Sequence, residues 1–131
     1  MDAELDESSV ADVKDTEEII VSQWRDISAG EKSQLREKVD EILRPLGLET
    51  RLLVMDRISS IALFFLCMTL SALMSLRDQW QSGQLKHTVE SLYTFLSGAS
   101  VRVKRLSWPE SDFERCSEIH HSARGNKTTL L

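Results

Sequence analysis

The chain has 131 residues, of which 41% are hydrophobic and 28% are charged, and its formal net charge is −5. This length predicts a single domain with a core of modest size. The acidic balance argues against a nucleic-acid-binding function that depends on bulk positive charge.

The N-terminal segment 1–15 is acidic and has no regular apolar spacing, which predicts a disordered lead. Apolar residues that include Trp24 then share one face of a helix expected over 17–27. A second helix is expected over 29–44, where apolar residues recur at spacings of four and three, and Pro45 ends it because proline cannot continue a regular helix.

No helix breaker separates Leu48 from Trp80, and apolar residues recur along this stretch at alternating spacings of four and three. The pattern predicts one long helix over 49–80. Ser82 and Gly83 end it, and the four-three-four spacing of the next apolar residues predicts a further helix over 84–97.

The residues 58–76 carry no charge, so this run is just long enough to span a membrane as a helix. The apolar stripe, however, continues beyond the run on both sides, which a membrane span does not require. We therefore expect an all-α bundle over 16–98, in which about four helices surround one long apolar helix with Leu66 and Leu73 at its core. A single-pass membrane protein that spans at 58–76 is the alternative.

The segment 99–131 is expected to hold a basic stretch and a mobile polar tail. Residues 101–104 alternate apolar and basic side chains, which predicts an extended strand. A basic patch, formed by Arg102, Lys104 and Arg105, could contact an anionic partner.

Ser107 is a candidate phosphorylation site. Lys104 and Arg105 lie three and two residues before it, an arrangement that resembles substrates of basophilic kinases, and Pro109 two residues after it resembles motifs read by 14-3-3 proteins. A phosphate there would add nearly two negative charges to the basic patch. The alternative is a solvated charged strand with Trp108 packed on the bundle.

The sequence shows no catalytic constellation, and we expect neither an enzyme nor a bound cofactor. Cys116 and His120 are spaced i, i+4, but one such pair supplies only two of the four ligands of a structural zinc site. With Cys67 and Cys116 as its only cysteines, the chain has no disulfide framework, which favours an intracellular protein of the cytoplasm or nucleus. An integral membrane protein is the alternative location.

These observations predict a non-enzymatic helical interaction protein, a small adaptor or a subunit of a complex. It would bind a helical protein partner, or a second copy of itself, through amphipathic seams on its helices. The expected seam residues are Trp24, Leu35, Val39, Ile42, Leu85, Val89, Leu92 and Leu96.

Overall fold

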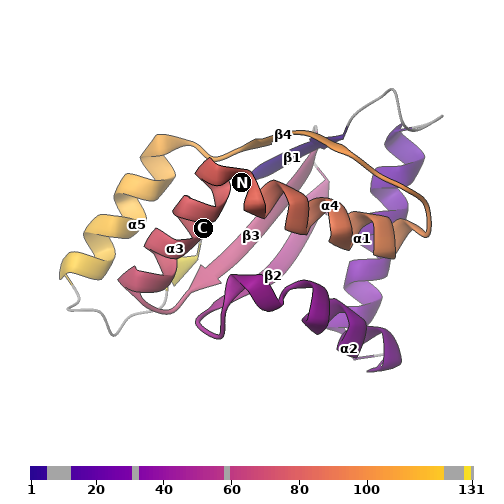
Figure 1. Cartoon of the computed structure of the whole chain (residues 1–131), viewed down its shortest axis with the longest axis horizontal. Helices are drawn as coiled ribbons and strands as arrows, with labels where there is room; N and C mark the ends of the chain where they lie inside the picture. The colour runs from indigo at the N-terminus through magenta and orange to yellow at the C-terminus, as the bar shows by residue number, and fades with distance from the viewer. Residues whose placement is uncertain (6–12, 31–32, 58–59, 123–128, 131) are drawn as a thin grey trace.

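The computed structural model describes residues 1–5, 13–30, 33–57, 60–122 and 129–130. Its architecture is mixed α/β, with helices packed around an antiparallel sheet (Figure 1). The expectation of an all-α bundle was therefore wrong. The elements in chain order are β1 (Asp2–Leu5), α1 (Val13–Ser28), α2 (Ser33–Ile42), the short 3₁₀ helix η2 (Arg44–Leu46), β2 (Thr50–Arg57), β3 (Ile61–Cys67), α3 (Leu70–Ser82), α4 (Gln84–Ser97), β4 (Val103–Ser107), α5 (Glu110–Ser122) and β5 (Thr129–Leu130).

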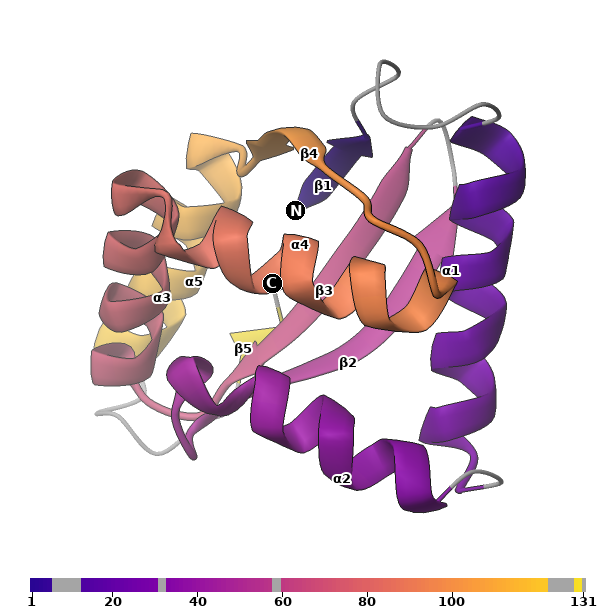
Figure 2. The same ribbon diagram turned by 45° about the vertical axis from the view of Figure 1, so that its right-hand side comes forward.

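The strands follow the order β2-β3-β1-β4, and the two-residue strand β5 also pairs with β3. Every neighbouring pair is antiparallel. In both ribbon views α4 crosses one face of the sheet, α3 lies at one end of α4, and α1 lies beyond β2 (Figures 1 and 2). The strands β2 and β4 are the first and last of this order.

The long helix expected over 49–80 is divided into β2, β3 and α3. The apolar stripe failed as a guide because β3 is apolar on both sides. Its core side is buried at Ile61, Leu63, Phe65 and Cys67, while Phe64 and Leu66 on the other side are only partly exposed. A continuous apolar run of this kind cannot be told from a buried helix by its periodicity.

The two residues expected at the centre of the bundle have different environments. Leu73 on α3 is fully buried, as predicted. Leu66 lies on the side of β3 that faces away from α4 and shares that side with Phe64, because side chains alternate along a strand.

The run 58–76 is divided between β3 and the beginning of α3, so the alternative of a membrane-spanning helix over these residues was also wrong. Residues 58 and 59 lie outside the described part of the chain. Among the described residues, no helix combines the length and the apolar character that crossing a membrane requires.

The three helices predicted over 17–27, 29–44 and 84–97 are present as α1, α2 with η2, and α4. The strand predicted at 101–104 overlaps β4 in part, since β4 begins at Val103 and continues to Ser107. The segments expected to lack structure hold further elements. Residues 2–5 form β1 between β3 and β4, and the polar segment after Pro109 holds α5 and β5.

Thr69 caps the N-terminus of α3, because its Oγ1 accepts a hydrogen bond of 3.0 Å from the backbone N–H of Ala72. This bond satisfies one of the N–H groups that the first helical turn leaves without a partner.

Replacing Thr69 with alanine is expected to lower the free energy of unfolding by about 1 kcal/mol, because the cap is lost while the helix remains. Urea denaturation followed by circular dichroism measures this loss. Ser71→Ala is the control, since Ser71 is an exposed hydroxyl residue in the first turn of the same helix. A loss as large in Ser71→Ala as in Thr69→Ala would contradict the capping role.

Candidate functional site: a cleft between α2 and β2

The residues predicted to form a partner-binding seam are buried, fully or partly, in the folded protein. Six of the eight are at most 5% exposed and belong to the hydrophobic core, namely Trp24, Val39, Leu85, Val89, Leu92 and Leu96. Leu35 and Ile42 are partly buried and pack against that core. Their four-three spacing therefore reflects packing of the helices with one another and with the sheet.

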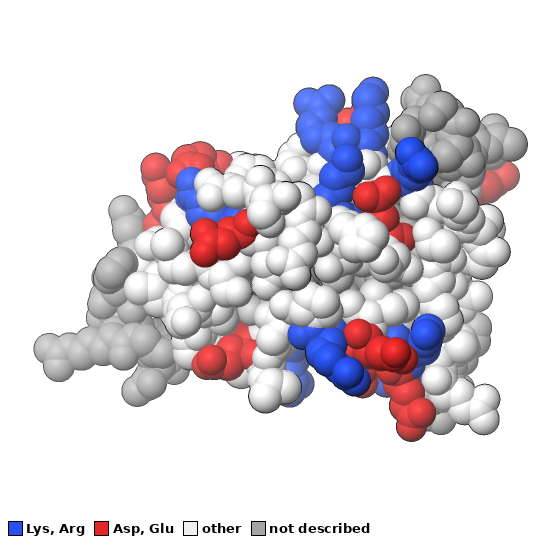
Figure 3. Space-filling view, in the orientation of Figure 1, with Lys and Arg blue, Asp and Glu red and all other residues white. Residues whose placement is uncertain are grey.

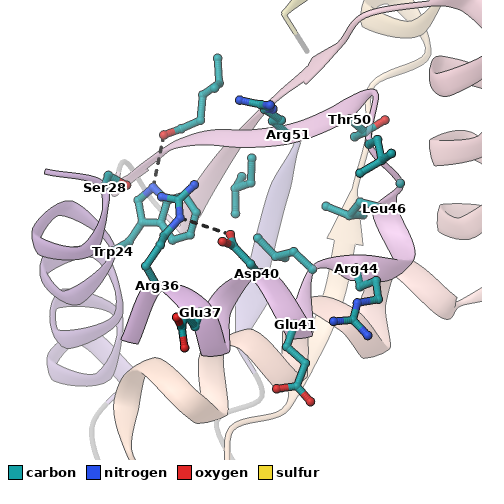
Figure 4. Close-up of a pocket in the computed structure, with 15 residues that line it drawn as sticks. Trp24, Ser28, Arg36, Glu37, Asp40, Glu41, Arg44, Leu46, Thr50 and Arg51 are labelled. Atoms are coloured by element: carbon teal, nitrogen blue, oxygen red, sulfur yellow. Dashed lines mark hydrogen bonds and ion pairs between the residues drawn. The ribbon is translucent and has the colours of Figure 1, made fainter. Parts of the chain in front are cut away.

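An open cleft of about 850 Å³ lies between α2 and β2 (Figure 4). One wall is formed by α2 and η2, the other by β2, and the C-terminal end of α1 closes the side at Trp24 and Ser28. The residues that line it are Trp24, Ser28, Arg36, Glu37, Asp40, Glu41, Leu43, Arg44, Leu46, Gly47, Leu48, Thr50, Arg51, Leu52 and Leu53.

The lining of the cleft includes several large apolar side chains. Leu46 and Leu52 are 6% exposed and belong to the core beneath it, whereas Leu53 is 40% exposed and Leu48 is 94% exposed. Exposed leucines beside a concave surface are the kind of feature that a binding partner covers. The turn at Gly47, whose φ is 87°, places Leu48 at the rim.

The strand β2 borders the cleft with one of its edges. Among the described strands, its only partner is β3, which pairs with it on one side. On the other side, α1 reaches β2 from Leu53 onward: Trp24 Nε1 donates to the carbonyl oxygen of Leu53 at 3.3 Å, and Arg25 pairs with Asp56 at 3.2 Å. The preceding residues 50–52 face the cleft, and an unpaired strand edge of this kind can accept another strand.

The rim of the cleft carries charges of both signs. Two ion pairs lie within α2, where Arg36 contacts Asp40 at 3.2 Å and Lys38 contacts Glu41 at 3.7 Å. Arg44 and Arg51 form no ion pair with any residue in the described part of the chain. The cleft thus offers two unneutralised guanidinium groups, an apolar surface and free main-chain groups, which together suit recognition of a peptide.

The predicted basic patch lies on β4. Lys104 and Arg105 are exposed and both contact the carboxylate of Glu4 on β1, at 3.8 and 3.4 Å, and Arg102 is exposed. Figure 3 shows Lys and Arg side chains gathered along this edge of the molecule with acidic side chains among them. Charged side chains on the last strand of a sheet also protect its edge against pairing with other chains.

Ser107, the candidate phosphorylation site, is the last residue of β4 and pairs with Asp2 of β1. Its side chain is half-buried, and Trp108 after it is buried against Trp80 and Phe113. A phosphate at this position would lie opposite the carboxylate of Asp2, and like charges opposite one another destabilise a strand pair. Modification of Ser107 remains a prediction.

The possible metal-binding pair of the sequence, Cys116 and His120, lies partly outside the residues whose side chains the structure describes. Cys116 on α5 is 2% exposed, and the side chains of residues 118–121 are not among those that the structure describes. Within the described part of the chain, no three His, Cys, Asp or Glu side chains form a group that could hold a metal ion.

The thiol of Cys67 gives the fold a pH dependence at high pH. Burial raises its pKa from 9.0 to about 11, and the weak contact of 4.0 Å from Thr50 only partly opposes this rise. In the unfolded chain the thiol loses its proton near pH 9, while in the folded chain it keeps the proton. The unfolded state then binds fewer protons, so the free energy of unfolding decreases as the pH rises from 9 to 11.

We expect this decrease to amount to about 2 kcal/mol for Cys67. Denaturant titrations at pH 8 and pH 11 measure it, with Cys67→Ala as the control that removes the titrating group. The decrease between these two pH values should be smaller in the variant than in the original protein. Equal decreases in the two proteins would show that the Cys67 thiol does not carry the effect.

The sequence did not single out the cleft. Its lining comes from α1, α2, η2 and β2, and no periodic pattern joins these segments. The one local signal was Pro45, which predicted the end of a helix without indicating what lies next to it.

Comparisons with known proteins add no relative, because no protein-family model, curated protein or solved structure matches this chain.

Proposed function

We propose that this chain is a non-enzymatic protein-interaction module that binds a segment of a partner protein in the cleft between α2 and β2. The observation that carries the proposal is the free edge of β2 at residues 50–52 beside exposed Leu48 and Leu53. Binding there would cover apolar surface and satisfy main-chain groups at the same time.

The proposal keeps the class of function that the sequence predicted, an adaptor or a subunit of a complex, and changes the binding surface. The helical seams cannot serve as that surface, since most of their side chains are needed to fill the core. The cleft lies outside that packing, so its occupation does not require the core to open.

Site-specific photo-crosslinking in the cells that make the protein tests the proposal. A photoreactive phenylalanine analogue placed at Leu48 is expected to give a discrete covalent adduct with a partner. The yield should fall when Leu53→Arg is also present, because the arginine would obstruct the cleft. Both positions are exposed, so the fold should tolerate these changes.

The control places the same analogue at His87, an exposed residue of α4 that does not line the cleft. The proposal predicts that the adduct from Leu48 is missing at His87. If both positions gave the same adduct, or if Leu53→Arg left the yield from Leu48 unchanged, the cleft would not be the binding site.

A further inference from the structure

Resting on the proposed function, we infer that the partner segment in the cleft is extended and acidic. It adds as a short strand beside residues 50–52 of β2, and it places a carboxylate in the positive field of Arg51 and Arg44. The first part of the inference comes from the edge of β2, and the second comes from the charges on the two walls of the cleft.

The edge of β2 limits the length of an added strand. The helix α1 meets β2 from Leu53 onward, through the bond from Trp24 to the Leu53 carbonyl and the ion pair between Arg25 and Asp56. An added strand is therefore restricted to residues 50–52, the three residues of β2 before this meeting point. Pairings of similar length already occur in the sheet, because β1 has four residues and β5 has two.

The charges on the walls of the cleft favour a partner segment that carries a negative charge. The acidic side chains Asp40 and Glu41 are already paired within α2, whereas Arg51 on β2 and Arg44 on η2 have no ion-pair partner among the described residues. These two arginines lie on opposite walls of the cleft, and Glu37 lies away from Arg44, toward the end that Trp24 closes (Figure 4). A carboxylate bound in the cleft would be attracted by both positive charges, and beside either guanidinium group it could accept directed hydrogen bonds.

The apolar side chains that flank this carboxylate would meet the leucines of the cleft. Successive side chains of an extended segment point to opposite sides, so an acidic residue directed toward the arginines alternates with residues directed elsewhere. The inferred motif is thus one aspartate or glutamate among β-branched or aromatic residues. A basic segment would instead face two uncompensated positive charges.

The test selects binders from a phage-displayed library of random 12-residue peptides, using the full chain as bait. Peptides are kept when they bind the original protein and fail to bind both Leu53→Arg and Leu48→Arg. Circular dichroism first establishes that each variant is folded. The kept peptides are expected to contain an acidic residue among β-branched or aromatic ones.

Synthetic versions of the selected peptides then test each part of the inference. Arg44→Glu and Arg51→Glu should each weaken binding by about tenfold, because a charge on the rim is reversed. Arg102→Glu, an exposed change on the distant basic patch, should leave the affinity unchanged. N-methylation of the peptide backbone should abolish binding at alternate positions only, since alternate N–H groups of an added strand face β2.

The outcomes separate this inference from the proposed function. Neutral or basic peptides that need Leu53 and ignore both Arg→Glu changes would overturn the inference and leave the proposed function standing. Acidic peptides whose sensitivity to N-methylation has no two-residue period would also overturn it, because such a segment is not paired with β2. If no selected peptide depends on the cleft, both the inference and the proposed function fail.

Discussion

Phe65→Ala is expected to lower the free energy of unfolding by about 3–5 kcal/mol, a large fraction of the stability of a domain of this size. Phe65 lies on β3 and is 1% exposed, on the side of the sheet that faces the core. Its removal would take a large apolar side chain out of the core and leave a cavity that the surrounding sheet and helices cannot fill. Urea denaturation followed by circular dichroism measures the loss.

The neighbouring Phe64 gives a matched control, because the same substitution is made one residue away on the opposite side of β3. Phe64 is partly exposed, and its partner across the strand pair is Val54, which is 44% exposed. Phe64→Ala is expected to cost only about 1 kcal/mol, since less surface is returned to water and no closed cavity forms. Similar losses in the two variants would contradict the assignment of the two sides of β3.

Arg57→Met is expected to lower the free energy of unfolding by about 3 kcal/mol, the second largest effect that the structure indicates. Arg57 Nε lies 3.4 Å from Oε1 of Glu17, whose side chain is only 6% exposed. Without the arginine, a buried carboxylate on α1 would have no counter-charge. The side chain of Arg57 is 33% exposed, so water reaches part of the pair and keeps the effect below that of a fully buried pair.

A double variant distinguishes the lost ion pair from lost packing. Glu17→Leu with Arg57→Met removes both charges, and its stability is expected to exceed that of Arg57→Met alone, because no unpaired charge remains. Chemical denaturation of the two single variants and the double variant completes the cycle. If the losses of the single variants simply add, the pair is not coupled and the loss in Arg57→Met comes from packing.

The carboxylate of Glu17 also affects Tyr93, a buried residue of α4. Tyr93 on α4 is fully buried, and its hydroxyl has no hydrogen-bond partner in the described part of the chain. Burial raises the pKa of Tyr93 well above 10.0, and the negative charge of Glu17 raises it further. The tyrosine therefore stays neutral in the folded protein, and it adds to the loss of stability at high pH that Cys67 produces.

The helix α4 and the end of the second predicted helix could be predicted because their sequence signals are local. In α4, Leu85, Val89, Leu92 and Leu96 repeat with helical spacing and are buried, and Gly83 and Gly98 stand at its two ends with positive φ. The end of the second helix was also local, since Pro45 excludes continuation of a regular helix. Such features act within a few residues of the chain and do not depend on the rest of the fold.

The strands β2 and β3 were not predictable from the same kind of pattern. Their apolar residues fit a helical stripe as well as a strand, and the register of β2 shifts between Leu52 and Val54, which breaks the alternation of two. The strand β1 gave even less signal, because its acidic residues Asp2 and Glu4 alternate with only Ala3 and Leu5. What makes residues 2–5 a strand is the hydrogen bonding that β3 and β4 offer on either side.

In the candidate site, too, some residues were recognised from the sequence and others only from the structure. Trp24 was recognised from the sequence as a residue on an apolar helix face and was predicted to belong to a partner-binding seam. The structure places its ring in the core and its indole N–H on the Leu53 carbonyl, where it ends the free edge of β2. Arg44 and Arg51 belong to no recognisable sequence pattern. Only the tertiary arrangement of η2 and β2 places them on opposite walls of one cleft.

The acidic character of the chain and the helices whose spacing and end signals are local could be read from the sequence. Only tertiary contacts made the described part of the uncharged run, residues 60–76, a strand followed by the start of a helix. The physical reason is that an apolar run specifies burial but not backbone conformation, which depends on whether other strands are present to satisfy its N–H and C=O groups. The cleft is a consequence of that choice, because it borders the strand edge that no other strand of the sheet covers.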